Sequence, residues 1–419
     1  MKEFFKHYGQ TVILLLSIII GAIIGLIWKE GATVLSPFGD IFLNLMFVII
    51  VPLVFLTIST SIARIEQPKR LGKIMGSIIL VIVITSIIAV VIGLLSTFFV
   101  KLVNVEDGKA ILESLENNNE EVKEEETEKL SIFERTVSAI TVSDFTGLLS
   151  KNNLIALVIF SILFGCAIKM SGEKGKPVQN FLESATIIIM NILKIVMYYA
   201  PIGLGCYFAA LVGNFGANIA LGYAKTFIIY LIVSVLYYFI MYTVYAFIAG
   251  KKKGVKVFWK NAIPPTVTAL ATCSSAASIP VNMEATSNMG ISSDIAETSI
   301  PLGTNLHKDG SIIGSVFKVM FLVCLFGTNI ATFGGAMQVL LVSLVATLLV
   351  TAVPIGGGTI SEMMILSMMG YPVAALPILT IIATIIDCPA TVLNVVGNTS
   401  SAMLVSRIVD GKDCIKDEK

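Results

Sequence analysis

The sequence is short of charge, and the charge it has is balanced. Only 14% of its 419 residues are charged, whereas 56% are hydrophobic; soluble domains carry about 25% charged residues. The formal net charge of +1 lacks the clustered basic excess that nucleic-acid-binding proteins carry. These shortages argue against a water-soluble fold and against a nucleic-acid partner.

Cysteine is also scarce and follows no metal-binding pattern. The six cysteines are scattered, mostly inside apolar segments, and none of them forms the CxxC pair used by zinc and redox sites. We interpret them as small apolar packing residues. The sequence therefore predicts no cofactor and no transition-metal site.

Long apolar runs, in contrast, make up most of the chain. A helix needs about 20 apolar residues to cross a bilayer. Such runs occur near 11–29, 39–63, 74–103, 153–170, 186–212 and 223–250. The first run has no A-x-A-like cleavage site after it and is predicted to be a span, not a signal peptide. Because the runs are apolar on all sides, we expect an all-α, multi-pass protein of the cell membrane.

Lysine and arginine are shared unevenly among the loops. Positive clusters at 64–73, 169–176 and 251–260 alternate with 30–39, 104–130 and 213–218, which positive charge does not dominate. Since cytoplasmic loops carry the excess of Lys and Arg, we predict that the positive loops and both termini are cytoplasmic. The acidic segment 104–130 has too little apolar surface to fold alone and is expected to be a solvated extracellular loop.

From about residue 255 to 409 the apolar stretches become short and are interrupted by polar residues. Such backbone is tolerated at bilayer depth only where it is buried in protein or lines a cavity, and transporters build their sites from discontinuous helices. The interruptions are Thr272–Pro280, Pro301–Ser311, Ala352–Thr359 and a polar stripe on a helix over 377–405. We predict that the substrate binds where these interruptions meet.

The first two interruptions carry different chemistry. Ser274 and Ser275, with free amides at a helix N-terminus, can hold a carboxylate; a helix interface packed through small residues explains them equally well. His307, Lys308 and Asp309 form a titratable run followed by the apolar run 312–324. Ionisable residues inside a span are costly and indicate function, although a surface loop is the alternative.

The other two interruptions suggest a moving element and a binding face. Gly356–Gly358 permit backbone carbonyls to converge and a lid to move. Asp387, Thr391, Asn394 and Asn398 follow one another at offsets of four, three and four, which places them on one helical face. Packing alone does not explain a carboxylate on that face.

On these residues the chain resembles the glutamate/dicarboxylate:cation symporter family, which includes the excitatory amino-acid transporters and their bacterial relatives. The resemblance covers nearly the whole chain. Its most specific motifs are Ser274–Pro280, His307–Ser311, Val353–Gly358 and Asp387–Asn398. It implies eight transmembrane helices and two re-entrant hairpins, one opening from each side, in a homotrimer whose protomers each transport by an elevator motion.

The resemblance also implies a division of the chain. Residues 1–250 would form six spans, of which helices one, two, four and five are scaffold and trimerisation helices and helices three and six belong to the transport domain. The transport core would be 251–409, and 410–419 a cytoplasmic tail. Within the core, the expected elements are hairpin one at 257–292, helix seven at 295–326, hairpin two at 338–371 and helix eight at 375–409.

Site roles follow from the same resemblance. Asp387 would hold the substrate's amino group, while Thr391 and Asn394 would bind its polar atoms. The expected substrate-binding residues are Ser274, Ser275, Ser311, Gly356, Gly357, Gly358, Asp387, Ala390, Thr391 and Asn394. Those expected to couple transport to an ion or proton are Thr85, Ser86, Gly303, His307, Lys308, Asp309, Asn394 and Asn398.

Departures from the family pattern bear on the substrate. Members that bind acidic substrates are expected to carry an arginine at the position of Cys273 or Ala390, which pairs with the substrate's side-chain carboxylate. Its absence favours a small neutral amino acid such as serine, alanine, threonine or cysteine. Lys308 could replace the arginine, so glutamate, aspartate and C4-dicarboxylates stay open.

Other departures bear on coupling. Asn398 stands where sodium-coupled members carry an aspartate, and His307 and Lys308 replace an asparagine and a methionine near sodium positions. A neutral amide holds a bare cation less well than a carboxylate does. We hypothesise that Lys308 is a tethered cation near Asp309, with Glu362 close by.

In this hypothesis protons drive uptake through His307 or the Lys308–Asp309 pair. The alternative is a Na⁺ ion near Asp309, held with Thr85 and Ser86, so the coupling ion is H⁺ or Na⁺.

Two other classes are weaker. A membrane hydrolase could use Ser275, His307 and Asp309, but no G-x-S-x-G motif is present, and residues two apart diverge on a helix; we expect no enzyme. An ion channel is also built from broken helices, yet Asp387 beside Thr391 suits occlusion of an amino acid better than conduction.

Overall fold

The computed structural model describes residues 2–63, 71–103, 141–150, 153–215, 217–330, 332–348 and 357–411. Over these residues every regular element is helical. The first half contains α1 (Lys2–Trp28), η1 (Lys29–Leu35), α2 (Ser36–Ala63), α3 (Leu71–Phe98), α6 (Phe145–Leu148), α7 (Leu154–Met170), η4 (Gly172–Gly175), α8 (Lys176–Phe215) and α9 (Ala217–Asn261). The second half contains α10 (Ile263–Thr272), α11 (Ile279–Asn288), α12 (Ser293–Leu306), α13 (Asp309–Phe326), α14 (Phe333–Leu348), α15 (Gly357–Met369), η5 (Val373–Ala375) and α16 (Leu376–Asp410).

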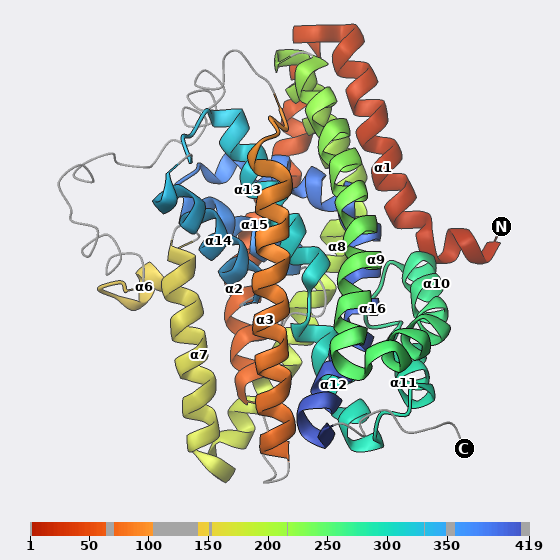
Figure 1. Cartoon of the computed structure of the whole chain (residues 1–419). Coiled ribbons are helices and arrows are strands. Elements are labelled where there is room, and N and C mark those ends of the chain that lie inside the picture. Colours follow the sequence, from red (N-terminus) through yellow and green to blue (C-terminus); the bar gives the residue numbers. More distant parts are fainter. Residues whose placement is uncertain are drawn as a thin grey trace.

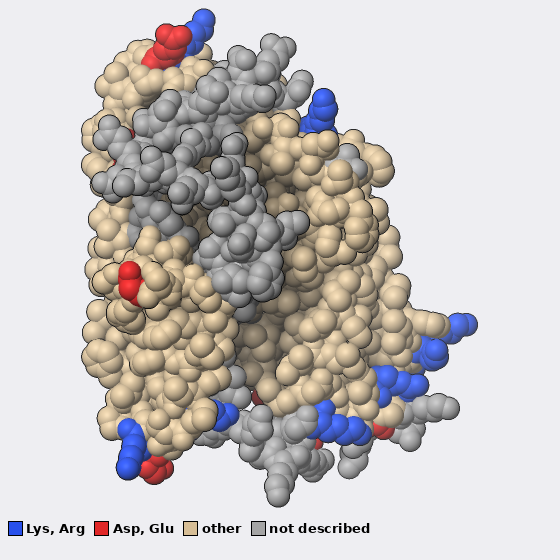
Figure 2. Space-filling model, turned by 90° about the vertical axis from the view of Figure 1, so that its left-hand side faces the viewer, with Lys and Arg blue, Asp and Glu red and all other residues tan. Residues whose placement is uncertain are grey.

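The outer helices expose large apolar side chains. Ile27 is 78% exposed, and Ile228 on α9 is 56% exposed. Figure 2 shows a broad surface almost free of charged groups, with most of the visible lysine and arginine side chains near its lower end. Five helical stretches of the described chain are long and apolar enough to cross a membrane. Such a surface is stable against lipid, where every backbone group must be satisfied within the helices.

Helices of the first half form one packed group. α8 runs along α1 and α2, and α7 packs on α2. The small residue Ala200 of α8 is fully buried. The expected spans near 11–29, 39–63, 153–170 and 186–212 correspond to α1, α2, α7 and α8. The predicted acidic loop 104–130 lies outside the described residues.

α16 is the centre of the second group. It contacts α9, α10, α12, α13 and α3, and α13 lies beside it with nearly all of its side chains buried. The expected span 223–250 belongs to α9, which continues to Asn261 across a kink at Gly250 and Lys251. The last spans are thus arranged around a helix that is buried even though its sequence carries a polar face.

The interruptions expected from the sequence fall between helices. α10 ends at Cys273, which adopts a left-handed conformation with φ 45°. His307 is extended, with φ −90° and ψ 105°, and separates α12 from α13. Gly356 lies outside the described residues, whereas Gly357 and Gly358 begin α15.

Two helix pairs approach the core from opposite directions. In Figure 1, α10 and α11 lie in the half of the molecule nearer the C-terminus, and α14 and α15 lie in the other half. α10 contacts both α11 and α16, and α15 contacts α14, α13 and α16. Both pairs therefore pack against α16.

Candidate functional site

The break between α12 and α13 buries a histidine beside a carboxylate. The Nε2 atom of His307 lies 3.6 Å from Oδ1 of Asp309 and 3.0 Å from Oγ1 of Thr85 on α3. The exposed fractions of His307 and Asp309 are 1% and 0%. Because buried charges must be paired or hydrogen-bonded, the groups around Asp309 decide whether its carboxyl group can carry a charge.

Tyrosines of α9 complete the surroundings of Asp309. The hydroxyl of Tyr237 donates to Oδ2 of Asp309 at 2.8 Å, and the hydroxyls of Tyr237 and Tyr245 are 3.1 Å apart. Two turns earlier on α9, Tyr230 donates to the carbonyl of Gly310 at 2.8 Å. These contacts fix the carboxylate and the first turn of α13 against α9.

Three polar atoms of this cluster have unused hydrogen-bonding capacity. Within the described chain, Oγ of Ser86, Nδ1 of His307 and Oδ1 of Asp309 are buried without a hydrogen-bond partner. Buried polar atoms are usually satisfied. The unused capacity therefore fits a group that binds and leaves, such as a proton or a small cation.

Asn398, one of the expected coupling residues, lies between α16 and α12. Its amide donates to the carbonyl of Ile300 at 2.8 Å and to Oγ1 of Thr304 at 3.1 Å. Gly303 faces this amide so closely that a Cβ atom at 303 would collide with Oδ1 of Asn398. Asn398 thus joins α16 to α12, although its own Oδ1 atom has no partner among the described residues.

Asp387 lies near the middle of α16 and yet is exposed. An exposed carboxylate on a central helix is accessible to a ligand. Lys308 and Lys318 both act electrostatically on Asp387. Two cations therefore compensate this carboxylate within the described residues.

The neighbouring polar face of α16 is held against α13. The Oδ1 atom of Asn394 accepts the backbone N–H of Ser311 at 3.2 Å, and its Nδ2 atom donates to Oγ of Ser311 at 2.9 Å. Gly310 permits this approach, since a Cβ there would collide with the backbone of Ala390. Thr391 is buried beside them, 5% exposed.

The turn between α10 and α11 reaches α16 next to Asp387. The thiols of Cys273 and Cys388 lie close enough to interact with one another. In the same turn Oγ of Ser274 accepts the N–H of Ala277 at 3.3 Å, and Ser275 is partly buried. The predicted serine-rich break therefore lies close to the predicted carboxylate.

The role of Lys308 as a tethered cation near Asp309 stays a prediction. Lys308 acts electrostatically on Asp387, and the imidazole of His307 lies beside Asp309. Glu362, expected close to Lys308, pairs with Lys318 at 3.0 Å.

Two groups of functional side chains were missed. The tyrosines of α9 had been counted only as part of an apolar span, although Tyr230, Tyr237 and Tyr245 recur at intervals of seven and eight residues, on one helical face. The run 312–324 was interpreted as apolar although it contains Lys318. A single cation inside an apolar run indicates a functional residue and could have identified it.

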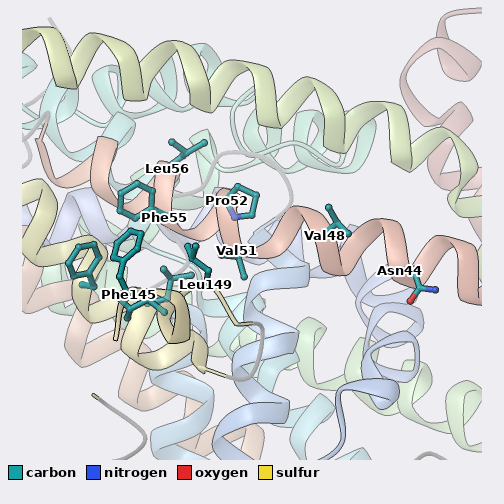
Figure 3. A pocket seen from close by; sticks show the side chains of 11 residues that line it. Asn44, Val48, Val51, Pro52, Phe55, Leu56, Phe145 and Leu149 are labelled. Carbon is teal, nitrogen blue, oxygen red and sulfur yellow. The ribbon is translucent and has the colours of Figure 1, made fainter. Parts of the chain in front are cut away.

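A separate cavity of about 850 Å³ lies between α2, α6 and α7. Figure 3 shows its lining, which is apolar apart from Asn44 at one end. It offers no charged group to a substrate. The candidate site is instead the polar seam between α13 and α16.

Apolar surfaces around a core of broken helices and buried ionisable groups define a membrane-embedded secondary transporter. The comparison with known families agrees. The profile of the Sodium:dicarboxylate symporter family matches residues 11–408, and the chain belongs to this family. Its members are transporters and not enzymes, and within the described chain His307 bonds Thr85 rather than Ser275.

Relatives match over almost their whole length. The chain is 27% identical over 414 residues to a "Proton/sodium-glutamate symport protein" of Geobacillus stearothermophilus, covering 96% of this chain and 95% of the relative. It is 26% identical over 419 residues to a "C4-dicarboxylate transport protein" of Rhizobium leguminosarum, covering 99% and 92%. A "C4-dicarboxylate transport protein" of Bacillus subtilis is 24% identical, covering 95% and 93%.

Proposed function

We propose that this protein is a proton-coupled symporter of an acidic amino acid such as glutamate. The observation that carries the proposal is the pairing of opposite charges at the polar seam: Asp387 is exposed on α16 while Lys308 acts on it from the α12–α13 break. An amino acid with a second carboxylate matches both charges.

In the proposed complex each charge of the substrate meets an opposite charge. The substrate's ammonium group binds Asp387, and its distal carboxylate binds Lys308, which takes the place of the arginine absent at Cys273 and Ala390. Asn394, already oriented by Ser311, contacts the remaining polar atoms. Buried charges of a ligand need such partners. The names of the glutamate-transporting relatives support this substrate class.

A small neutral amino acid is the second candidate. It is favoured by Cys273 and Ala390, which offer no bidentate partner to a distal carboxylate. The relatives are named for glutamate and C4-dicarboxylates, and these names give a neutral substrate no support. In this case Lys308 would pair with Asp387 while the transporter is empty, and the substrate's ammonium group would replace it on binding.

For coupling we propose the cluster of His307, Asp309 and Thr85. The imidazole can change its charge near physiological pH, and its Nδ1 atom has a free position. Asn398 offers a cation only a neutral amide oxygen, which holds a bare cation less well than a carboxylate does. Sodium coupling is the alternative, with Asp309, Thr85 and Ser86 as oxygen ligands; relatives named for both ions leave both candidates in place.

The proposed architecture is that of an elevator. We propose eight transmembrane helices, with α10–α11 and α14–α15 as re-entrant hairpins and 251–409 as a transport core that moves against scaffold helices of residues 1–250 in a homotrimer. The opposite placement of the two pairs supports this (Figure 1). Both termini are proposed to be cytoplasmic, as the distribution of lysine and arginine predicts.

Uptake by purified protein in proteoliposomes tests the substrate. Labelled glutamate, serine and succinate are compared for the wild type, Lys308→Gln and the control Lys252→Gln, which alters an exposed lysine. We expect glutamate uptake by the wild type and the control, and a loss of about tenfold or more in Lys308→Gln, since a desolvated charge pair is broken. Serine uptake that Lys308→Gln leaves unchanged, without glutamate uptake, would favour the neutral substrate.

A further inference from the structure

A second buried ion pair lies in the core. The Nζ atom of Lys318 on α13 lies 3.0 Å from Oε1 of Glu362 on α15. The two residues are 6% and 1% exposed. A lysine and a glutamate are almost never buried to this degree unless they are paired.

The carboxylate of Glu362 is satisfied on both sides. Its Oε1 atom accepts a hydrogen bond from the ammonium group of Lys318, and its Oε2 atom accepts one from the hydroxyl of Thr380 on α16 at 2.8 Å. Glu362 therefore ties α15 to two other helices at one point. Each of these contacts is directional, unlike the apolar packing around it.

Lys318 is the last member of a polar stripe along α13. Ser311 bonds Asn394 on α16, and Ser315 lies 2.8 Å from Thr347 on α14 through their hydroxyls. Offsets of four and three put Ser311, Ser315 and Lys318 on one face of the helix. The stripe thus joins α13 in turn to α16, α14 and α15.

Stability alone does not explain a buried pair of this kind. The cost of desolvating two charges offsets much of their attraction, and replacement of such a pair by apolar residues is often neutral or stabilising. A fixed geometry is what the pair supplies. Glu362 lies five residues after Gly357, little more than one turn from the start of α15.

We propose that Lys318 and Glu362 are positioning residues that hold the first turn of α15 at the candidate substrate site. The pair fixes α15 on α13, and Thr380 fixes it on α16, so that the helix that begins with Gly357 and Gly358 is held against both helices of the polar seam. Lys318 also adds its charge to that of Lys308 on Asp387. The consequence for uptake rests on the proposed function, but the placement of α15 does not.

Amide hydrogen exchange, measured by mass spectrometry on protein in nanodiscs, tests the placement without a substrate. The variants are Glu362→Gln, the apolar pair Lys318→Met/Glu362→Leu, and the reversed pair Lys318→Glu/Glu362→Lys. We expect amides of α15 to exchange at least about tenfold faster in the first two, and amides of α3 and α9 to keep their rates. The reversed pair should restore slow exchange, because the Thr380 hydroxyl can also accept from an ammonium group.

The apolar pair keeps the proposal testable if Glu362→Gln fails to fold. Unchanged α15 exchange in the apolar pair would overturn the proposal, and so would faster exchange spread equally over all helices, which marks a purely structural role. For uptake, we expect the apolar pair to raise KM about tenfold with a smaller change in kcat, and the reversed pair to rescue it. If the wild type transports none of the substrates, the proposed function fails while the exchange result still decides the role of the pair.

Discussion

The ring of His307 lies 3.6 Å from the carboxylate of Asp309, and Thr85 contacts the same ring nitrogen at 3.0 Å. An imidazole thus occupies the space next to a buried acid whose other oxygen is bonded to Tyr237. In the proposed mechanism a titratable group, and not a set of oxygen ligands alone, couples uptake to an ion gradient.

Replacement of His307 by asparagine should uncouple uptake from protons. His307→Asn keeps a polar side chain beside Thr85 but removes the titratable ring, so uptake driven by a proton gradient should fall by about tenfold or more. Exchange of labelled for unlabelled substrate at equal pH should remain. Thr85→Ser, which keeps the hydroxyl, is the control. Full proton-driven uptake by His307→Asn would exclude the histidine as the coupling group.

Asp387 should be required for binding the amino group. Asp387→Asn removes the charge that faces the ammonium group, and we expect the binding affinity to fall about 100-fold, which corresponds to about 3 kcal/mol. Thermal-shift titration of purified protein measures the affinity. Glu284→Gln, which alters an exposed acid on α11, should bind as the wild type does. Equal affinities for Asp387→Asn and the wild type would place the amino group elsewhere.

The contact between Gly303 and Asn398 predicts a pairwise effect on stability. Gly303→Ala brings a methyl group into the Asn398 amide and should lower the free energy of unfolding by about 1–3 kcal/mol. In the Asn398→Ala variant the amide is absent. Adding Gly303→Ala to that variant should therefore lower the free energy of unfolding less than it does in the wild type. Thermal unfolding of the four proteins measures the coupling. Additive effects would show that the two residues do not meet.

The thiols of Cys273 and Cys388 should join on oxidation. Each thiol gives up its proton, and the two electrons pass to the oxidant diamide as the S–S bond forms, which ties the α10–α11 turn to α16. We expect diamide to stop uptake by the wild type and dithiothreitol to restore it. Cys273→Ser should resist the oxidant. If Cys273→Ser loses activity as fast as the wild type, another thiol is responsible.

Much of the architecture was predictable because lipid imposes strict rules on sequence. Apolar runs of sufficient length identified α2 and α8, and polar residues at bilayer depth marked the ends of α10 and α12. The face that joins Asp387 to Asn394 was visible as well, since helical spacing fixes which residues share a side. The substrate seam follows from these two patterns.

Contacts between distant segments were harder to predict from the sequence. The sequence did not predict that Lys308 acts electrostatically on Asp387. It also did not predict that the amide of Asn398 donates to α12, where Gly303 lets the two helices approach. Pairings of this kind depend on backbone geometry and on packing, which the local pattern of one sequence does not encode.

Uptake of labelled glutamate into proteoliposomes under one ion gradient at a time tests the central claim most directly. With an inward proton gradient and no sodium, we predict accumulation above the equilibrium level, and its loss in His307→Asn. Accumulation driven only by an inward sodium gradient, and unaffected by the proton gradient, would contradict proton coupling through His307 and Asp309.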